Sequence, residues 1–168
     1  MRKVLDLRKV FGVILSFESK QNPSEPFEME MQLEPKGKSS LHTHPHQQEI
    51  YDVKEGELEV YLNDRWNTIK AGQQVLIPQA NKHAFRNTGT QKAVTLNKHI
   101  PGLRTQEYFE TLQRLIDERK VTGITGFRNG IYLSLHTVKY ADVVKLYQPP
   151  DALIKAAAIV GKIFGYKI

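Results

Sequence analysis

Short segments of alternating polarity, separated by turns, constrain the fold of this chain more than any other feature. In residues 27–33, and again in residues 57–62, every second side chain is apolar, which is the pattern of a β-strand with one buried face. Turn-forming sequences follow at Asn63-Asp64-Arg65 and at Ala71-Gly72. Strands this short and turns this frequent predict a β-sandwich or a small barrel over residues 27–100.

The C-terminal part of the chain has apolar residues at helical spacing instead. Residues 105–119 predict an amphipathic helix with Thr105 as its N-cap. Residues 132–147 are a second helix candidate, preceded by an irregular segment from Gly123 to Gly130. A third helix is predicted over residues 152–164, which are apolar on most faces.

The chain therefore divides into a β domain over residues 1–100, which includes N-terminal strands, and a helical extension over residues 101–168. A total of 168 residues suits a single domain with a tail. No segment approaches the roughly 18 apolar residues of a spanning helix. The N-terminus lacks both the uninterrupted apolar region and the cleavage site of a signal peptide, so we expect a cytoplasmic protein.

Composition excludes several classes of function. The net charge is +6, but the basic residues form no run or patch, so we expect no nucleic-acid partner. The chain has no cysteine, which excludes disulfides, thiolate zinc sites and cysteine nucleophiles. Any metal ion must be held by nitrogen and oxygen atoms.

Three histidines and one glutamate form the most informative pattern. His42 and His44 are two residues apart, so on a strand both side chains lie on one face. Glu49 follows at an odd offset and needs a tight bend, for which Pro45 is a natural position. His83 lies on a later segment that can run beside the first. Such a set suits divalent iron, manganese, nickel, cobalt or zinc.

These residues stand in two motifs that resemble those of the cupin superfamily. The first is Gly37-x4-His42-x-His44-x4-Glu49-x6-Gly56, and the second is Gly72-x5-Pro78-x-Ala80-x2-His83-x3-Asn87. The spacer of fifteen residues between the motifs is similar to that of compact bacterial cupins. Two positions depart from the family pattern: one residue fewer separates Gly37 from His42, and Ala80 stands where glycine is usual.

The resemblance implies a mainly β fold: a double-stranded β-helix or jelly-roll barrel within residues 1–100, with the motifs over residues 37–87, and a C-terminal α-helical extension over residues 101–168. It also implies a divalent metal ion bound by His42, His44, Glu49 and His83. Strand parity places Tyr51 on the same inward face as Glu49.

The remaining histidines are assigned from their positions. Tyr51 and His99 are the candidate catalytic residues, although His99 could equally line the pocket or face solvent. His46 falls in the turn between the ligands, so we expect it to be exposed. His136 lies in a helix candidate and is expected to be structural.

Three functions remain open. The first is a metal-dependent enzyme of oxygenase or isomerase type that acts on a small organic molecule. The second is a non-catalytic cupin that binds or senses a small molecule, and the third is a protein with a vestigial pocket. The intact ligand set favours the first and makes the third the least favoured.

The apolar C-terminal helix of the extension must pack against another surface. The sequence of the extension resembles the tail of a group of small bacterial cupins that share a helical extension, and residues 152–164 are too apolar to stay free in water. They must cover the barrel, pack against a second subunit or lie on a membrane. Lys155 and Lys162 are too few for the basic face of a membrane-bound helix, so we expect covering or a homodimer first and membrane contact second.

Overall fold

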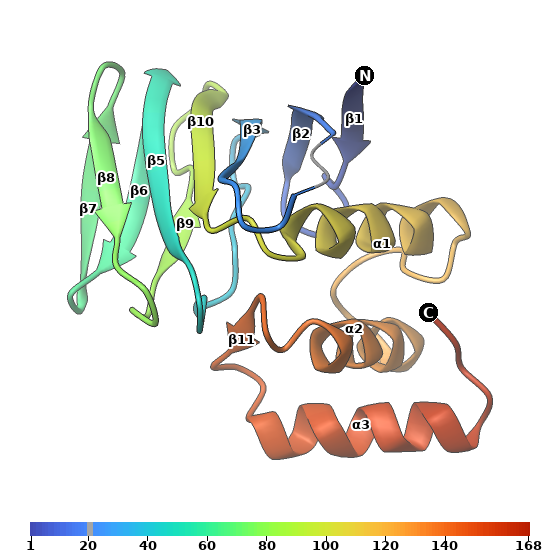
Figure 1. Ribbon diagram of the computed structural model, residues 1–168. Helices are drawn as coiled ribbons and strands as arrows, with labels where there is room; N and C mark the ends of the chain where they lie inside the picture. Colours follow the sequence, from blue (N-terminus) through green and yellow to red (C-terminus); the bar gives the residue numbers. More distant parts are fainter. Residues whose placement is uncertain (20–21) are drawn as a thin grey trace.

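The computed structural model describes residues 1–19 and 22–168, and two antiparallel sheets form its body (Figure 1). The larger sheet has the strand order β1-β2-β3-β10-β5-β8, and the smaller has the order β7-β6-β9. The strands are β1 (Arg2–Asp6), β2 (Val13–Glu18), β3 (Phe27–Leu33), β4 (His42–Thr43), β5 (Gln48–Glu55), β6 (Glu57–Leu62), β7 (Arg65–Lys70), β8 (Gln74–Ile77), β9 (Ala84–Arg86), β10 (Ala93–Ile100) and β11 (Lys145–Leu146). This arrangement is the predicted double-stranded β-helix.

The apolar faces of the two sheets meet in one core. The strand predicted over residues 27–33 forms as β3, between β2 and β10. Its inward residues Met29, Met31 and Leu33 are buried with Val60 of the smaller sheet. Burial of these side chains drives the closure of the barrel, because each contributes on the order of 2 kcal/mol of transfer free energy.

Two turns have the left-handed backbone that their sequences imply. Asn63 and Asp64 connect β6 to β7 with φ values of 55° and 60°, as the two-residue turn of a tight hairpin requires, so the turn predicted here is confirmed. Ala80 has a φ of 60°, which costs an L-residue about 1–2 kcal/mol. The backbone N–H of Ala80 donates to the carbonyl of His44 at 2.9 Å, so this turn is anchored beside the predicted metal ligands.

Three helices follow the barrel: α1 (Thr105–Asp117), α2 (Phe127–Lys139) and α3 (Asp151–Ile163). The first and third lie within two residues of their predicted bounds. Thr105 is not the N-cap of α1, because Arg104 occupies that position without a side-chain cap. The hydroxyl of Thr105 instead accepts a hydrogen bond from Gln47 at 2.8 Å.

The second helix is the largest correction to the sequence analysis. The predicted range of 132–147 is wrong at both ends, because α2 begins at Phe127, inside the segment expected to be irregular, and ends at Lys139. Asn129 stabilises the start of α2 by accepting from the backbone N–H of Thr122 at 3.0 Å. After α2 the chain turns and forms β11, which pairs with β4 of the barrel.

The helices form layers on one side of the barrel. Figure 1 shows α1 next to the sheets, α2 beyond it and α3 outermost. Ile154 and Ala158 of α3 are buried, with Ala158 in a cluster that includes Ile131 and Leu135 of α2. In the part of the chain that the structure describes, no helix has the length and apolar character needed to cross a membrane.

Candidate metal centre

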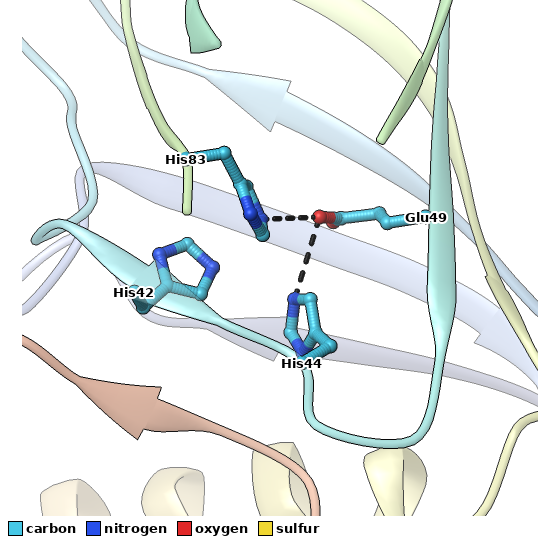
Figure 2. Close-up of side chains that lie close together, drawn as sticks. All are labelled: His42, His44, Glu49 and His83. Atoms are coloured by element: carbon cyan, nitrogen blue, oxygen red, sulfur yellow. Dashed lines mark ion pairs between the residues drawn. The ribbon is translucent and has the colours of Figure 1, made fainter. Parts of the chain in front are cut away.

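The four predicted ligands come together in one buried cluster (Figure 2). His42 lies on β4, His44 follows it, Glu49 lies on β5, and His83 immediately precedes β9. One ligand atom from each residue lies within 4.8 Å of the other three, and all four residues are buried.

Local backbone structure explains how the ligands meet. His42 and His83 face each other across an antiparallel bridge, and each backbone N–H donates to the other's carbonyl at 2.9 Å. Pro45 and His46 form the turn between His44 and β5. This turn is the predicted bend that brings Glu49 onto the inward face.

Backbone carbonyls fix the tautomer of all three histidines. A carbonyl oxygen only accepts, so each Nδ1 that contacts one carries the hydrogen and leaves Nε2 with a free lone pair. The contacts join Nδ1 of His42 to Ser40 at 2.8 Å, of His44 to Val143 at 2.8 Å and of His83 to Asn81 at 2.9 Å. This outer support is typical of histidines that bind metal ions.

The inward atoms of the cluster lack hydrogen-bond partners. Nε2 of His44, Nε2 of His83 and Oε2 of Glu49 are buried, and none makes a hydrogen bond to any described residue. Oε2 nevertheless lies 2.8 Å from Nε2 of His83 and 3.4 Å from Nε2 of His44. Unpaired polar atoms in a protein interior cost about 1–3 kcal/mol each, and a divalent cation held between them would remove that cost. The residues present therefore fit a divalent metal ion of the kind held by nitrogen and oxygen.

The protonation states of Glu49 and His42 suit a metal ion. Burial by itself raises the pKa of Glu49, but the imidazoles of His99, His44 and His83 outweigh it and hold the pKa well below the usual range. Burial, together with His83 and His44, lowers the pKa of His42. A carboxylate and a neutral imidazole are the forms that bind metal ions.

Asn97 is a functional residue that the sequence analysis missed. Its side-chain Nδ2 donates to Oε1 of Glu49 at 2.8 Å and so fixes the carboxylate from the side opposite the histidines' contacts with Oε2. Asn97 lies two residues from His99 on β10, so strand parity was the signal that could have identified it.

His99, one of the two candidate catalytic residues, lies beside Glu49. It lines the cavity rather than facing solvent, and its Nε2 is 3.4 Å from Oε1 of Glu49. Neither ring nitrogen makes a hydrogen bond to a described residue. Burial lowers the pKa of His99 to about 3, which keeps the ring neutral.

Tyr51 is buried on β5 and also lines the cavity, as its predicted inward face requires. Its ring packs edge-on against Phe85, with the centroids 5.9 Å apart. Burial and the neighbouring Glu49 raise the pKa of Tyr51 well above its usual value. The phenol therefore stays protonated and can act as a donor.

The two other histidines of interest lie where the sequence analysis placed them. His46 is exposed in the turn. His136 is buried in α2, and its Nε2 contacts the carbonyl of Tyr108 at 2.9 Å. Burial lowers the pKa of His136 to about 4, so it is a neutral residue that joins α2 to α1.

A cavity of about 940 Å³ opens beside the ligands. Its lining includes His42, His44 and Glu49, together with apolar side chains from both parts of the chain. The barrel contributes Leu15, Met29 and Phe85, and the extension contributes Phe109, Leu133 and Ile154. A polar cluster at an apolar cavity is the usual arrangement of a small-molecule site.

Two known proteins are similar in sequence to part of this chain. Protein SchB from Streptomyces halstedii is 43% identical over 54 residues, which are 32% of this chain and 39% of SchB. Polyketide synthase CurC from Streptomyces cyaneus is 38% identical over 61 residues, which are 36% of this chain and 40% of CurC. The match thus spans about two fifths of the length of each of these relatives.

A solved structure and a family model agree with the motifs. The crystal structure of a predicted oxalate decarboxylase from Thermotoga maritima superimposes with a TM-score of 0.50 and 25% identity, covering 53% of this chain and 80% of that one. Residues 29–97 match the family model of the cupin domain. The two motifs, the barrel and this match identify residues 29–97 as a cupin domain.

Proposed function

We propose that this protein is a metal-dependent enzyme of oxygenase or isomerase type that acts on a small organic molecule. His42, His44, Glu49 and His83 would hold the ion, which would be iron, manganese, nickel, cobalt or zinc. The observation that carries the proposal is a set of buried atoms on His44, Glu49 and His83 that make no hydrogen bond to a described residue, beside a large cavity. When bound, the metal would polarise a substrate oxygen or provide a place for dioxygen.

The cavity supports a particular class of substrate. A metal site of this kind suits a head group with two oxygens, such as a keto acid, a diol or an enol. Apolar walls contributed by Phe85, Phe109 and Leu133 suit an apolar body attached to that head. One partial relative bears the name polyketide synthase, and polyketides are carbon chains that carry such oxygens.

Two side chains at the cavity are candidates for proton transfer to and from the substrate. His99 is neutral and has ring nitrogens without hydrogen-bond partners among the described residues, so it is the candidate acceptor of a substrate proton. Tyr51 stays protonated at the same cavity, so it is the candidate donor to a substrate oxygen. Asn97, which donates to Oε1, would keep Glu49 in place.

A non-catalytic binding or sensor role is the second candidate. One observation favours it. The helical extension both lines the cavity and contacts His44, so a ligand bound in the cavity would contact the helices and could shift their position. Turnover distinguishes the two roles.

The test is oxygen uptake and product analysis with iron(II)-loaded or manganese(II)-loaded protein and a panel of apolar keto acids, diols and enols. We expect turnover in the wild type and in the His46→Ala control, a loss of at least about 100-fold in His99→Gln, and none in His83→Ala. Saturable binding of panel compounds without turnover by metal-loaded protein would contradict the enzymatic role and support the binding role.

A further inference from the structure

The helical extension, together with the barrel, holds the strand that carries His42. Strand β11 pairs antiparallel with β4, which is part of the first motif. The pairing sets Lys145 opposite Thr43 and Leu146 opposite His42, and the backbone N–H of Tyr147 donates to the carbonyl of Leu41 at 3.0 Å. In the described part of the chain, strand β4 thus pairs with β11 on one side, and His42 bridges to His83 on the other.

The extension also holds His44 directly. The hydrogen bond from Nδ1 of His44 ends on the carbonyl of Val143, a residue 99 positions further along the chain. Val143 is fully buried and packs in a cluster with Tyr108 and Tyr140. The place of its carbonyl is therefore set by the core of the extension.

We propose that residues 143–147, here named the clasp, position His42 and His44 for metal binding, so that docking of the helical extension on the barrel and metal affinity are coupled. The proposal rests on the metal site proposed above and deepens it by assigning its control to the extension. Coupling of this kind is reciprocal. A bound ion stabilises the docked clasp, and a loosened clasp weakens binding of the ion.

The same docking shapes the cavity. Phe109, Leu133 and Ile154 of the three helices line it together with the ligands. Undocking of the clasp therefore opens one wall of the cavity and releases two ligands together. The tightly binding state of the site is the state in which the extension closes that wall.

The first test uses the full-length wild type and cobalt(II) alone, whose visible absorption reports coordination. We expect cobalt(II) to slow amide hydrogen exchange in residues 143–147 by about tenfold or more, which corresponds to roughly one order of magnitude in the opening equilibrium. The β6–β7 hairpin serves as the internal reference. In His83→Ala, which leaves the clasp contacts intact, this protection should disappear with the metal.

The second test compares two substitutions at one position. Tyr147→Pro removes the N–H that donates to Leu41, whereas Tyr147→Ala keeps it. We expect Tyr147→Pro to weaken cobalt(II) binding by about tenfold or more, because it loosens the strand that carries His42. Tyr147→Ala should stay within about threefold of the wild type, because it keeps the backbone contact.

The outcomes separate the two proposals. Wild type that binds no cobalt(II) contradicts the metal site, and the clasp with it. Bound cobalt(II) with unchanged exchange in residues 143–147 contradicts the clasp alone, as does a folded Tyr147→Pro protein with wild-type affinity. If Tyr147→Pro does not fold, the exchange experiment on the wild type decides.

Discussion

Individual hydrogen bonds determine which atoms of the site are free for a metal ion. Backbone carbonyls occupy Nδ1 of His42, His44 and His83 and leave each Nε2 available. Asn97 donates to Oε1 of Glu49 and leaves Oε2 turned toward Nε2 of His83 and His44. Three histidines and a glutamate can bind many divalent ions. Their hydrogen bonds add fixed side-chain orientations before any ion binds.

The protonation of His83 predicts a pH dependence of metal binding. Burial lowers the pKa of His83, but Glu49 outweighs burial and raises it above the usual value. A metal ion must displace this proton, so affinity is full above the raised pKa and falls as the pH drops through it. We expect the dissociation constant for cobalt(II) to rise about tenfold per pH unit on the acid side.

A titration series between pH 8 and pH 5.5 measures this dependence by cobalt(II) absorption. The His46→Ala protein is the control, because His46 is exposed in the turn, and its profile should match the wild type. An affinity that stays constant across the series would show that no proton competes with the metal ion.

At the scale of elements, the packing of α3 on α2 depends on one small residue. Gly161 faces α2 so closely that a Cβ there would lie 2.6 Å from Cγ2 of Ile131. Ile131 is buried and β-branched, so it cannot move aside easily. The absence of a side chain at position 161 is what lets the two helices approach.

Substitution of Gly161 by valine tests this packing. We expect Gly161→Val to lower the free energy of unfolding by about 1–3 kcal/mol, the cost of overpacking a core. Ala156→Val is the matched control on the exposed side of the same helix and should change stability by less than about 0.5 kcal/mol. Equal denaturation midpoints for both proteins would refute the close packing.

The elements also show what sequence could and could not predict. Strand β3 matches its predicted range because burial of one face imposes a period of two on the residues. The second half of the helix predicted over 132–147 was wrong, because its apolar spacing is compatible with both a helix and a turn followed by a strand. Val143 and Leu146 look helical in spacing, yet the segment pairs with β4, about a hundred residues away.

At the candidate site, too, the sequence predicted some residues and missed others. The four ligands were predicted from the spacing of their motifs, and the structure brings them together. Asn97 was missed, and the pocket position of His99 was undecided, because both depend on which face of β10 points inward. Val143 contacts His44 only through its backbone carbonyl. Every residue has such a carbonyl, so the amino-acid type at position 143 could not predict this contact.

At the scale of the whole molecule, the outer face of α3 remains apolar. Leu153, Ile159, Ile163 and Phe164 are exposed on the helix that lies farthest from the barrel (Figure 1). Contiguous apolar residues on a surface are typical of contact sites. The homodimer that the sequence predicts stays a prediction, and this face is where we expect the second subunit.

Light scattering of the purified protein measures the assembly. We expect a dimer mass for the wild type and for Lys145→Ala, which leaves α3 unchanged. Ile163→Asp should shift the equilibrium to the monomer, because it sets a charge in an apolar contact. A monomer mass for the wild type at tens of micromolar protein would contradict the dimer, and flotation of that protein with anionic vesicles would favour the membrane alternative.

Metal content is the most direct test of the central claim. The measurement is mass spectrometry of untagged protein, comparing the wild type with His42→Ala, His83→Ala and the control His46→Ala. We expect about one equivalent of iron, manganese, nickel, cobalt or zinc in the wild type and the control, and its loss in both ligand variants. Metal that remains at wild-type stoichiometry in His42→Ala and His83→Ala, or a wild type that binds none after reconstitution, would contradict the claim.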